Sequence, residues 1–308
     1  MTLLTLTFAA CGGGDDRPSR AVQLRIATGT KGGVYNVYGR ALADLVNKYL
    51  SPWRATASGT DGSVENVQRL ADGRANVAFS VADVVGPALR GQSPFSHRIP
   101  VVALARLYDD YVQIIARGDS KLRTIADLRG KTVSISARGS GTALTARRIL
   151  RLRNLGLRGA HAPRIVTLPL EESANALAAR RIDAFVWSGG LPSPAVEKLR
   201  HKVRIRLLAL PAGTAADLNP NLYTETVIPE FVYGREGAVR TVAAANLLVV
   251  RADLADDVAF RLTALLFQHR SELERAHPEA RRLNKGGAIT TYPLELHPGA
   301  SRWYQQHP

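Results

Sequence analysis

The sequence lacks the residues that hold small folds together covalently or through metals. A single cysteine, Cys11, occurs among its 308 residues, which excludes an internal disulfide framework and a cysteine-cluster metal site. No stretch beyond the first residues approaches 18 consecutive apolar side chains, so we expect no membrane span there. Zinc-finger spacing, an RNA-recognition signature and a long lysine–arginine tract are also missing. We therefore expect no nucleic-acid partner.

Acidic residues are scarce relative to basic ones. The chain has 26 aspartates and glutamates against 41 lysines and arginines, a formal net charge of +15. Such an excess suggests an anionic partner, either nucleic acid, an anionic membrane surface or an anionic ligand. The sign of the charge alone does not choose among these, and the arginines are scattered along the chain.

Signatures of catalysis and of cofactor binding are missing as well. The loop Gly29-Thr30-Lys31-Gly32-Gly33 spells neither the dinucleotide-binding nor the P-loop motif, so we expect no phosphate-containing cofactor. Gly139-Ser140-Gly141-Thr142 lacks the spacing of a nucleophile elbow. The seven histidines show no metal-ligand spacing. The sequence therefore predicts no enzyme, no cofactor and no metal site.

The N-terminus has the pattern of an export signal. Residues 1–10 (MTLLTLTFAA) are a short apolar run followed by Cys11 and a polar, glycine-rich stretch. This run is too short to span a bilayer and is typical of a signal peptide. Because Phe8-Ala9-Ala10-Cys11 resembles a bacterial lipobox, we predict that residues 1–21 are signal and linker. Cys11 would carry a lipid and anchor the protein outside the cytoplasm; the alternative is a frayed terminus with a chance cysteine.

From Leu24 onward, short apolar runs alternate with amphipathic segments, which predicts an α/β fold with parallel strands covered by helices. One series of strand–helix units runs to residue 90, and a second runs from 131 to 187. The strand-like segment 101–117 contains Asp109-Asp110, which we interpret as the first crossing between two lobes. Segment 242–250 is predicted to carry the chain back.

The predicted architecture is therefore two mostly parallel sheets flanked by helices, with a hinge between the lobes. Lobe 1 would comprise residues 22–110 plus 246–308, and lobe 2 residues 111–245. The hinge strands are expected near 110–113 and 243–247.

Loops at the carboxyl ends of the predicted strands form the candidate binding site. In open parallel sheets ligands bind beyond these ends, where helix N-termini attract negative charge. Glycines and small hydroxylated residues fill most of these loops, and Lys31 and Arg138 are candidates to pair with a carboxylate. Surface charge is the alternative for these two residues, and packing is the alternative for Tyr35 and Trp187. The predicted ligand-binding residues are Thr30, Lys31, Gly33, Tyr35, Ser58, Thr60, Ser80, Arg138, Ser140, Gly141, Thr142, Trp187 and Ser188.

Several of these segments, in order along residues 22–304, resemble one family. They are residues 27–35 (ATGTKGGVY), 58–66 (SGTDGSVEN), 139–142 (GSGT), 183–192 (DAFVWSGGLP) and the terminal HPGA with Trp303-Tyr304. Together they resemble the TAXI-type solute receptors of TRAP transporters. The resemblance implies a periplasmic-binding protein type II fold, no enzymatic activity, an ion-driven permease partner, and a small organic acid such as glutamate or a dicarboxylate as ligand. Thr30, Lys31 and Arg138 depart from the family pattern in the ligand loops.

The sequence thus predicts an extracytoplasmic solute-binding receptor that captures a small anionic solute by hinge closure and delivers it to a TRAP-type permease. One alternative is a ligand-sensing ectodomain that reports to a membrane signalling partner. Another is an enzyme, such as a transferase, with its cleft between the lobes.

Overall fold

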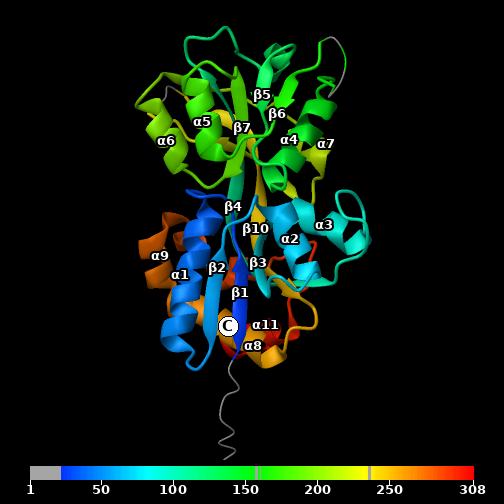
Figure 1. Ribbon diagram of the computed structural model, residues 1–308, viewed down its shortest axis with the longest axis vertical. Coiled ribbons are helices and arrows are strands. Elements are labelled where there is room, and N and C mark those ends of the chain that lie inside the picture. The colour runs from blue at the N-terminus through cyan, green and yellow to red at the C-terminus, as the bar shows by residue number, and fades with distance from the viewer. Residues whose placement is uncertain (1–21, 157–158, 160, 235–236) are drawn as a thin grey trace, which may run out of the picture.

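The computed structural model describes residues 22–156, 159, 161–234 and 237–308. The predicted signal peptide, the lipobox and Cys11 lie outside the described residues. Figure 1 shows two lobes, one above the other, joined by the long strands β4 and β10.

The first strand–helix series builds one lobe. Strands β1 and β2 pair in parallel, and β1 also pairs in parallel with β3. Helix α1 buries Tyr38, Leu42 and Val46 against this sheet, which matches the 3.6-residue period of its apolar side chains. The elements are β1 (Gln23–Ala27), α1 (Val34–Tyr49), β2 (Arg54–Ser58), α2 (Ser63–Ala71), β3 (Val77–Val81) and α3 (Ala82–Arg90).

Two antiparallel strands, β4 (Val101–Arg117) and β10 (Val239–Arg251), pass through both lobes. Strand β10 pairs with β3 in the first lobe and with β9 (Tyr223–Ile228) in the second. Strand β4 pairs with β7 only from Tyr111 onward. Both strands change partner close to Asp110 and Ala244, which lie opposite each other. The lobe borders expected at 110/111 and 245/246 stay a prediction, as does movement of the lobes as separate bodies.

The second lobe repeats the strand–helix plan with shorter elements. Strand β5 pairs in parallel with β6 and β7, and β7 pairs antiparallel with β4. The elements are η1 (Ile125–Leu128), β5 (Thr132–Ser134), α4 (Gly141–Leu152), β6 (Arg164–Val166), α5 (Leu170–Ala178), β7 (Ala184–Gly189), α6 (Pro194–Arg200), β8 (Ile205–Leu207) and α7 (Thr214–Leu218).

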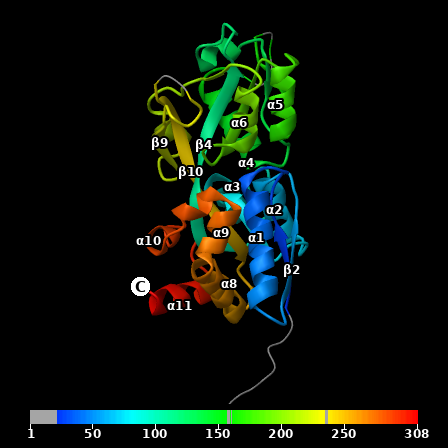
Figure 2. The ribbon, with the colours of Figure 1, turned by 90° about the vertical axis from the view of Figure 1, so that its left-hand side faces the viewer.

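The chain then returns to the first lobe, whose lower part it completes (Figure 2). The terminal motif serves as core there, because the Trp303 ring stacks on Phe267 at 4.8 Å and the Tyr304 hydroxyl donates to the Leu104 carbonyl at 3.1 Å. The returning elements are α8 (Asp256–Gln268), α9 (Arg270–Ala276), η2 (Pro278–Arg282), α10 (Lys285–Ala288) and α11 (Pro298–Gln306).

The two-lobed α/β fold predicted from the sequence is confirmed. The sheets of the two lobes share β4 and β10. The strands of the described part of the chain therefore form one continuous ten-stranded sheet. None of the helices within these ranges is long and apolar enough to cross a membrane.

Candidate functional site

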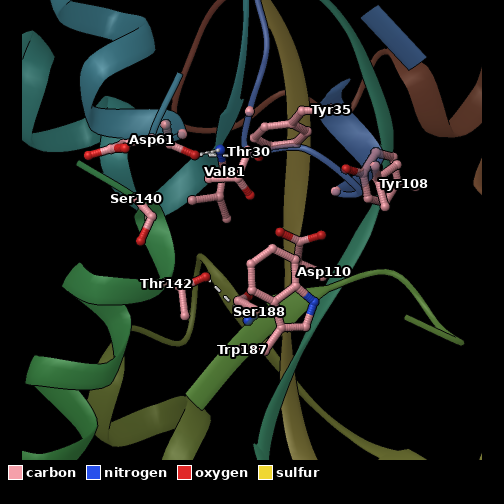
Figure 3. A pocket seen from close by; sticks show the side chains of 17 residues that line it. Thr30, Tyr35, Asp61, Val81, Tyr108, Asp110, Ser140, Thr142, Trp187 and Ser188 are labelled. Atoms are coloured by element: carbon pink, nitrogen blue, oxygen red, sulfur yellow. Dashed lines mark hydrogen bonds between the residues drawn. The ribbon is translucent and has the colours of Figure 1, made fainter. Parts of the chain in front are cut away.

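A cavity lies between the lobes, beside the point where β4 and β10 pass from one lobe to the other (Figure 3). About 490 Å³ of non-atom space lies within it, a figure that includes its opening to solvent. Both lobes contribute to its walls. The predicted residues that line it are Thr30, Gly33, Tyr35, Ser140, Gly141, Thr142, Trp187 and Ser188.

Five predicted residues lie outside this cavity. Lys31 lines a neighbouring hollow beside Glu171, and Arg138 is exposed to solvent. The other three are hydroxyl residues that hydrogen-bond within their own lobe. The Ser58 hydroxyl accepts from Arg69 at 3.1 Å, the Thr60 hydroxyl donates to Asn66 at 2.7 Å and the Ser80 hydroxyl donates to the Val81 carbonyl at 3.2 Å.

The start of α1 forms one wall of the cavity. Gly33 is its extended N-cap, and the first N–H groups of a helix have no acceptor within that helix. The Tyr35 ring stacks on Phe79 with centroids 5.3 Å apart, and its hydroxyl donates to the Asn246 side chain. Burial raises the pKa of Tyr35 well above its usual range. The phenol therefore stays protonated at physiological pH.

The start of α4 forms the facing wall. The Ser140 hydroxyl caps the helix by accepting from the Ala143 N–H at 3.0 Å, and it donates to the Ala137 carbonyl at 2.7 Å. The hydroxyl of Thr142 accepts from the Ser188 N–H at 3.2 Å, which ties α4 to β7 (Figure 3). Gly141 and Thr142, which carry first-turn N–H groups of α4, are among the residues that line the cavity. Such groups, with the helix dipole, favour an anion.

Helix α2 contributes less than the sequence predicted, because the other lobe occupies its N-terminus. The Gly139 carbonyl accepts from the N–H groups of Val64 and Glu65, at 3.0 and 3.2 Å. This contact crosses between the lobes, so the structure has them closed over the cavity. Only Ser63, Gly62 and Asp61 near this helix end line the cavity. The helix N-termini that remain for an anion are those of α1 and α4.

Asp110 is a wall residue that the sequence reasoning did not single out as a ligand-binding residue. It lines the cavity, is only 7% exposed, and its Oδ1 has no hydrogen-bond partner in the described residues. Burial raises the pKa of this carboxyl to about 8, an effect that the nearby Asn246 amide opposes and that Glu279, Asp109 and Asp83 reinforce. Asp110 is therefore mostly protonated at pH 7 and can act as a hydrogen-bond donor.

The side chains of the cavity thus differ from the basic site that was expected. Within the described ranges, no lysine or arginine lines it, and its carboxyl groups belong to Asp61 and Asp110. An anion would therefore be held by backbone N–H groups and hydroxyls. The same ranges contain no group of three or more histidine, cysteine or carboxylate side chains placed to hold a metal ion.

Several solved structures that align with this chain are named as components of solute importers. The binding protein of an ABC phosphonate transporter from Pseudomonas aeruginosa aligns with a TM-score of 0.58 at 12% identity, covering 84% of this chain and 78% of that one. The periplasmic aliphatic sulphonate binding protein SsuA from Escherichia coli aligns with a TM-score of 0.50 at 16% identity, over 93% and 84% of the two chains. A putative L-cystine ABC transporter protein from Listeria monocytogenes gives 0.52 at 13% identity, over 83% and 94%.

At these identities the solved structures establish the fold, which is that of type II periplasmic-binding proteins. The sequence itself matches the pattern of one family from residue 26 to residue 307, which is nearly all of the described chain. On that match, the chain belongs to the NMT1-like family.

Proposed function

We propose that this protein is an extracytoplasmic receptor that captures a small organic anion between its lobes and passes it to a membrane permease. The observation that carries the proposal is the cavity between the lobes, walled by the N-termini of α1 and α4 and closed by contacts between the lobes. Such a site suits reversible capture of a solute. The chain is proposed to be a binding protein and not an enzyme, as its structural neighbours are binding components of importers.

The solute is proposed to be a dicarboxylate or an acidic amino acid such as glutamate. One carboxylate would accept hydrogen bonds from the first-turn N–H groups of α1 and α4. A second acceptor group would meet the protonated carboxyl of Asp110. Two of the structural neighbours are described as binding proteins for anionic compounds, a sulphonate and a phosphonate, which supports the anionic charge and leaves the solute's identity to experiment.

The proposed mechanism is closure about a hinge. Strands β4 and β10 are the long strands that enter both lobes, and they exchange partners near Asp110 and Ala244. Bending there would open the cavity without disrupting the sheet of either lobe. The closed form would be the one that the permease recognises.

The partner is proposed to be a TRAP-type permease, and the anchor a lipid on Cys11. The five motifs that resemble TAXI-type receptors support the permease, and the lipobox-like sequence supports the anchor. A sensing ectodomain would use the same clamp. Uptake of the bound solute by membrane vesicles that contain a permease encoded next to this protein would support transport. Activation of a kinase encoded next to it would support sensing.

The capture itself is tested by small-angle X-ray scattering and calorimetry of the purified protein with a panel of organic acids that includes glutamate, succinate and glutarate. We expect at least one of them to bind with saturation and to reduce the radius of gyration. Turnover of a bound compound would instead indicate an enzyme. Absence of both binding and compaction across the panel would contradict the proposal.

A further inference from the structure

A second polar cluster joins the lobes away from the solute cavity. Its centre is Asp83, in the first turn of α3 in the first lobe. The side chain of Asp83 is completely buried, and it does not line the cavity. A buried carboxylate needs hydrogen-bond donors to offset the loss of its hydration, so the source of those donors decides what the residue does.

The hydrogen bonds that the Asp83 side chain accepts come from the second lobe. Its Oδ2 accepts from the Thr145 hydroxyl of α4 at 3.0 Å, from the Arg148 guanidinium of α4 at 3.1 Å and from the Tyr223 hydroxyl of β9. The hydroxyls of Thr145 and Tyr223 also lie 3.1 Å apart. The other oxygen, Oδ1, is buried and has no partner in the described part of the chain. Nothing in its own lobe therefore replaces these donors at the Asp83 side chain.

This arrangement exists only while the lobes are together. Opening would separate α3 from α4 and β9, which would return Asp83 and Arg148 to water and break three hydrogen bonds at once. Burial raises the pKa of Asp83, and Arg148 opposes that shift. The cluster therefore carries a desolvation cost that the three donors offset in the closed form alone.

We propose that Asp83, Thr145, Arg148 and Tyr223 form an interlobe latch that stabilises the closed form and sets the lifetime of the bound solute. The latch deepens the proposed function and rests on it, because it acts on the closure that traps the solute. Its residues are positioning residues, since they do not touch the cavity. Weakening the latch should speed opening, and hence solute release, while the association rate changes little.

The test compares Tyr223→Phe and Thr145→Val with Tyr233→Phe as a matched control. Tyr233 is also a buried tyrosine, but its hydroxyl contacts, Gln113 at 2.7 Å and the Ser193 N–H at 2.9 Å, lie within the second lobe. Stopped-flow kinetics with the tightest-binding acid of the panel should show about tenfold faster release for each latch variant, with Tyr233→Phe and the hydroxyl-retaining Thr145→Ser near wild type. Equal release rates for Tyr223→Phe, Tyr233→Phe and wild type would overturn the latch.

A second readout does not depend on the solute. Spin labels at Arg40→Cys in α1 and Lys198→Cys in α6, both exposed positions, report the distance between the lobes in a Cys11→Ser background. Without solute, Tyr223→Phe should lower the ratio of closed to open forms about tenfold, and an unchanged ratio would count against the latch. If no acid in the panel binds, the proposed function fails, and this measurement still decides the latch.

Discussion

At the scale of single residues, the protonation state of Asp110 determines how well the cavity binds an anionic solute. Its carboxyl lines a cavity that favours an anion. If the carboxyl were ionised at neutral pH, it would repel an anionic solute. With a pKa of about 8, it is mostly neutral at pH 7, and it can donate a hydrogen bond to the solute. The titratable groups that act on it, Glu279, Asp109 and Asp83, are all acidic, so each of them favours the protonated form.

The consequence is a pH-dependent affinity for an anionic solute. Below about pH 8 Asp110 carries its proton, and affinity should be constant. Above pH 8 the protonated fraction falls tenfold per pH unit, and affinity should fall in parallel. Calorimetry from pH 6 to 9.5 should show this decline in the wild type and a flat profile in Asp110→Asn. Asp109→Asn is the control, because Asp109 pairs with Arg106 outside the cavity. It should keep the decline, moved to a somewhat lower pH because Asp109 helps to raise the pKa of Asp110. Affinity that rises with pH would indicate a solute that presents an ammonium group to Asp110.

Gly141 is a second residue whose role depends on closure. A Cβ atom at this position would lie 2.6 Å from Val81 Cγ1 and 3.1 Å from Ser63 Oγ, both in the other lobe. We expect Gly141→Ala to fold normally, because it opens α4 with a better helix former, but to close poorly and to lose at least tenfold in affinity. Scattering with saturating solute should show less compaction. Gly86→Ala is the control, since its Cβ would meet nothing closer than 3.6 Å, and impaired closure in both variants would contradict this view.

At the scale of elements, α2 shows why hydroxyl residues in a loop do not all reach the ligand. Asn66 of α2 donates to the carbonyls of Thr28 and Phe79, at 2.5 and 2.8 Å, and accepts from the Thr60 hydroxyl. The amide thereby joins α2 to the middle of β3 and to the residue that follows β1, from a completely buried position. The Thr60 hydroxyl is hydrogen-bonded within this network, so Thr60 supports the loop and does not line the cavity.

This network should matter for stability. Asn66→Ala would leave several buried polar groups without partners, so we expect the free energy of unfolding to fall by about 2–4 kcal/mol. Urea unfolding monitored by circular dichroism measures the change. Asn47 offers a matched comparison, because it also bridges a helix to strand backbone, at Ala55, but is exposed to solvent. Asn47→Ala should cost about 1 kcal/mol or less, since water replaces its bonds, and an equal loss at both sites would be inconsistent with this reasoning.

The sequence predicted elements well where apolar periodicity was regular. The strand-like segment 101–117 and the segment expected over 242–250 were found as strands at Val101–Arg117 and Val239–Arg251. It missed α6, α7 and β9, which lie among prolines or in a stretch without a clear pattern. Short elements there are set by tertiary contacts, as when β9 pairs with β10, and periodicity cannot reveal them.

The limits were similar for the candidate site. Loops at strand ends line the cavity between the lobes, but a loop pattern does not show which hydroxyls are already hydrogen-bonded. Asp110 was interpreted only as a crossing between lobes, although an aspartate buried inside an apolar strand is unusual. The latch around Asp83 could not be foreseen, because its three partners lie 62 to 140 positions from Asp83 in the sequence.

At the scale of the whole molecule, closure is built from contacts that surround the cavity. The Gly139 carbonyl caps α2, the Asp83 cluster joins α3 to α4 and β9, and the Leu191 N–H donates to Glu279 of η2 at 2.8 Å. Because these contacts join several different pairs of elements across the two lobes, the lobes should open and close as units. Solute entry should then require the whole interface to separate.

A reversible crosslink tests this requirement. A Cβ on Gly139 would lie 3.3 Å from the Cβ of Glu65, close to the separation of a disulfide, so Gly139→Cys with Glu65→Cys in a Cys11→Ser background should crosslink the closed form. The oxidised protein should neither admit nor release solute, and reduction with dithiothreitol should restore exchange. Each single cysteine variant controls for the loss of the Glu65–Arg69 ion pair and of the glycine. Free exchange in the oxidised double variant would mean that solute enters without separation of the lobes, and closure would then not be the step that traps it.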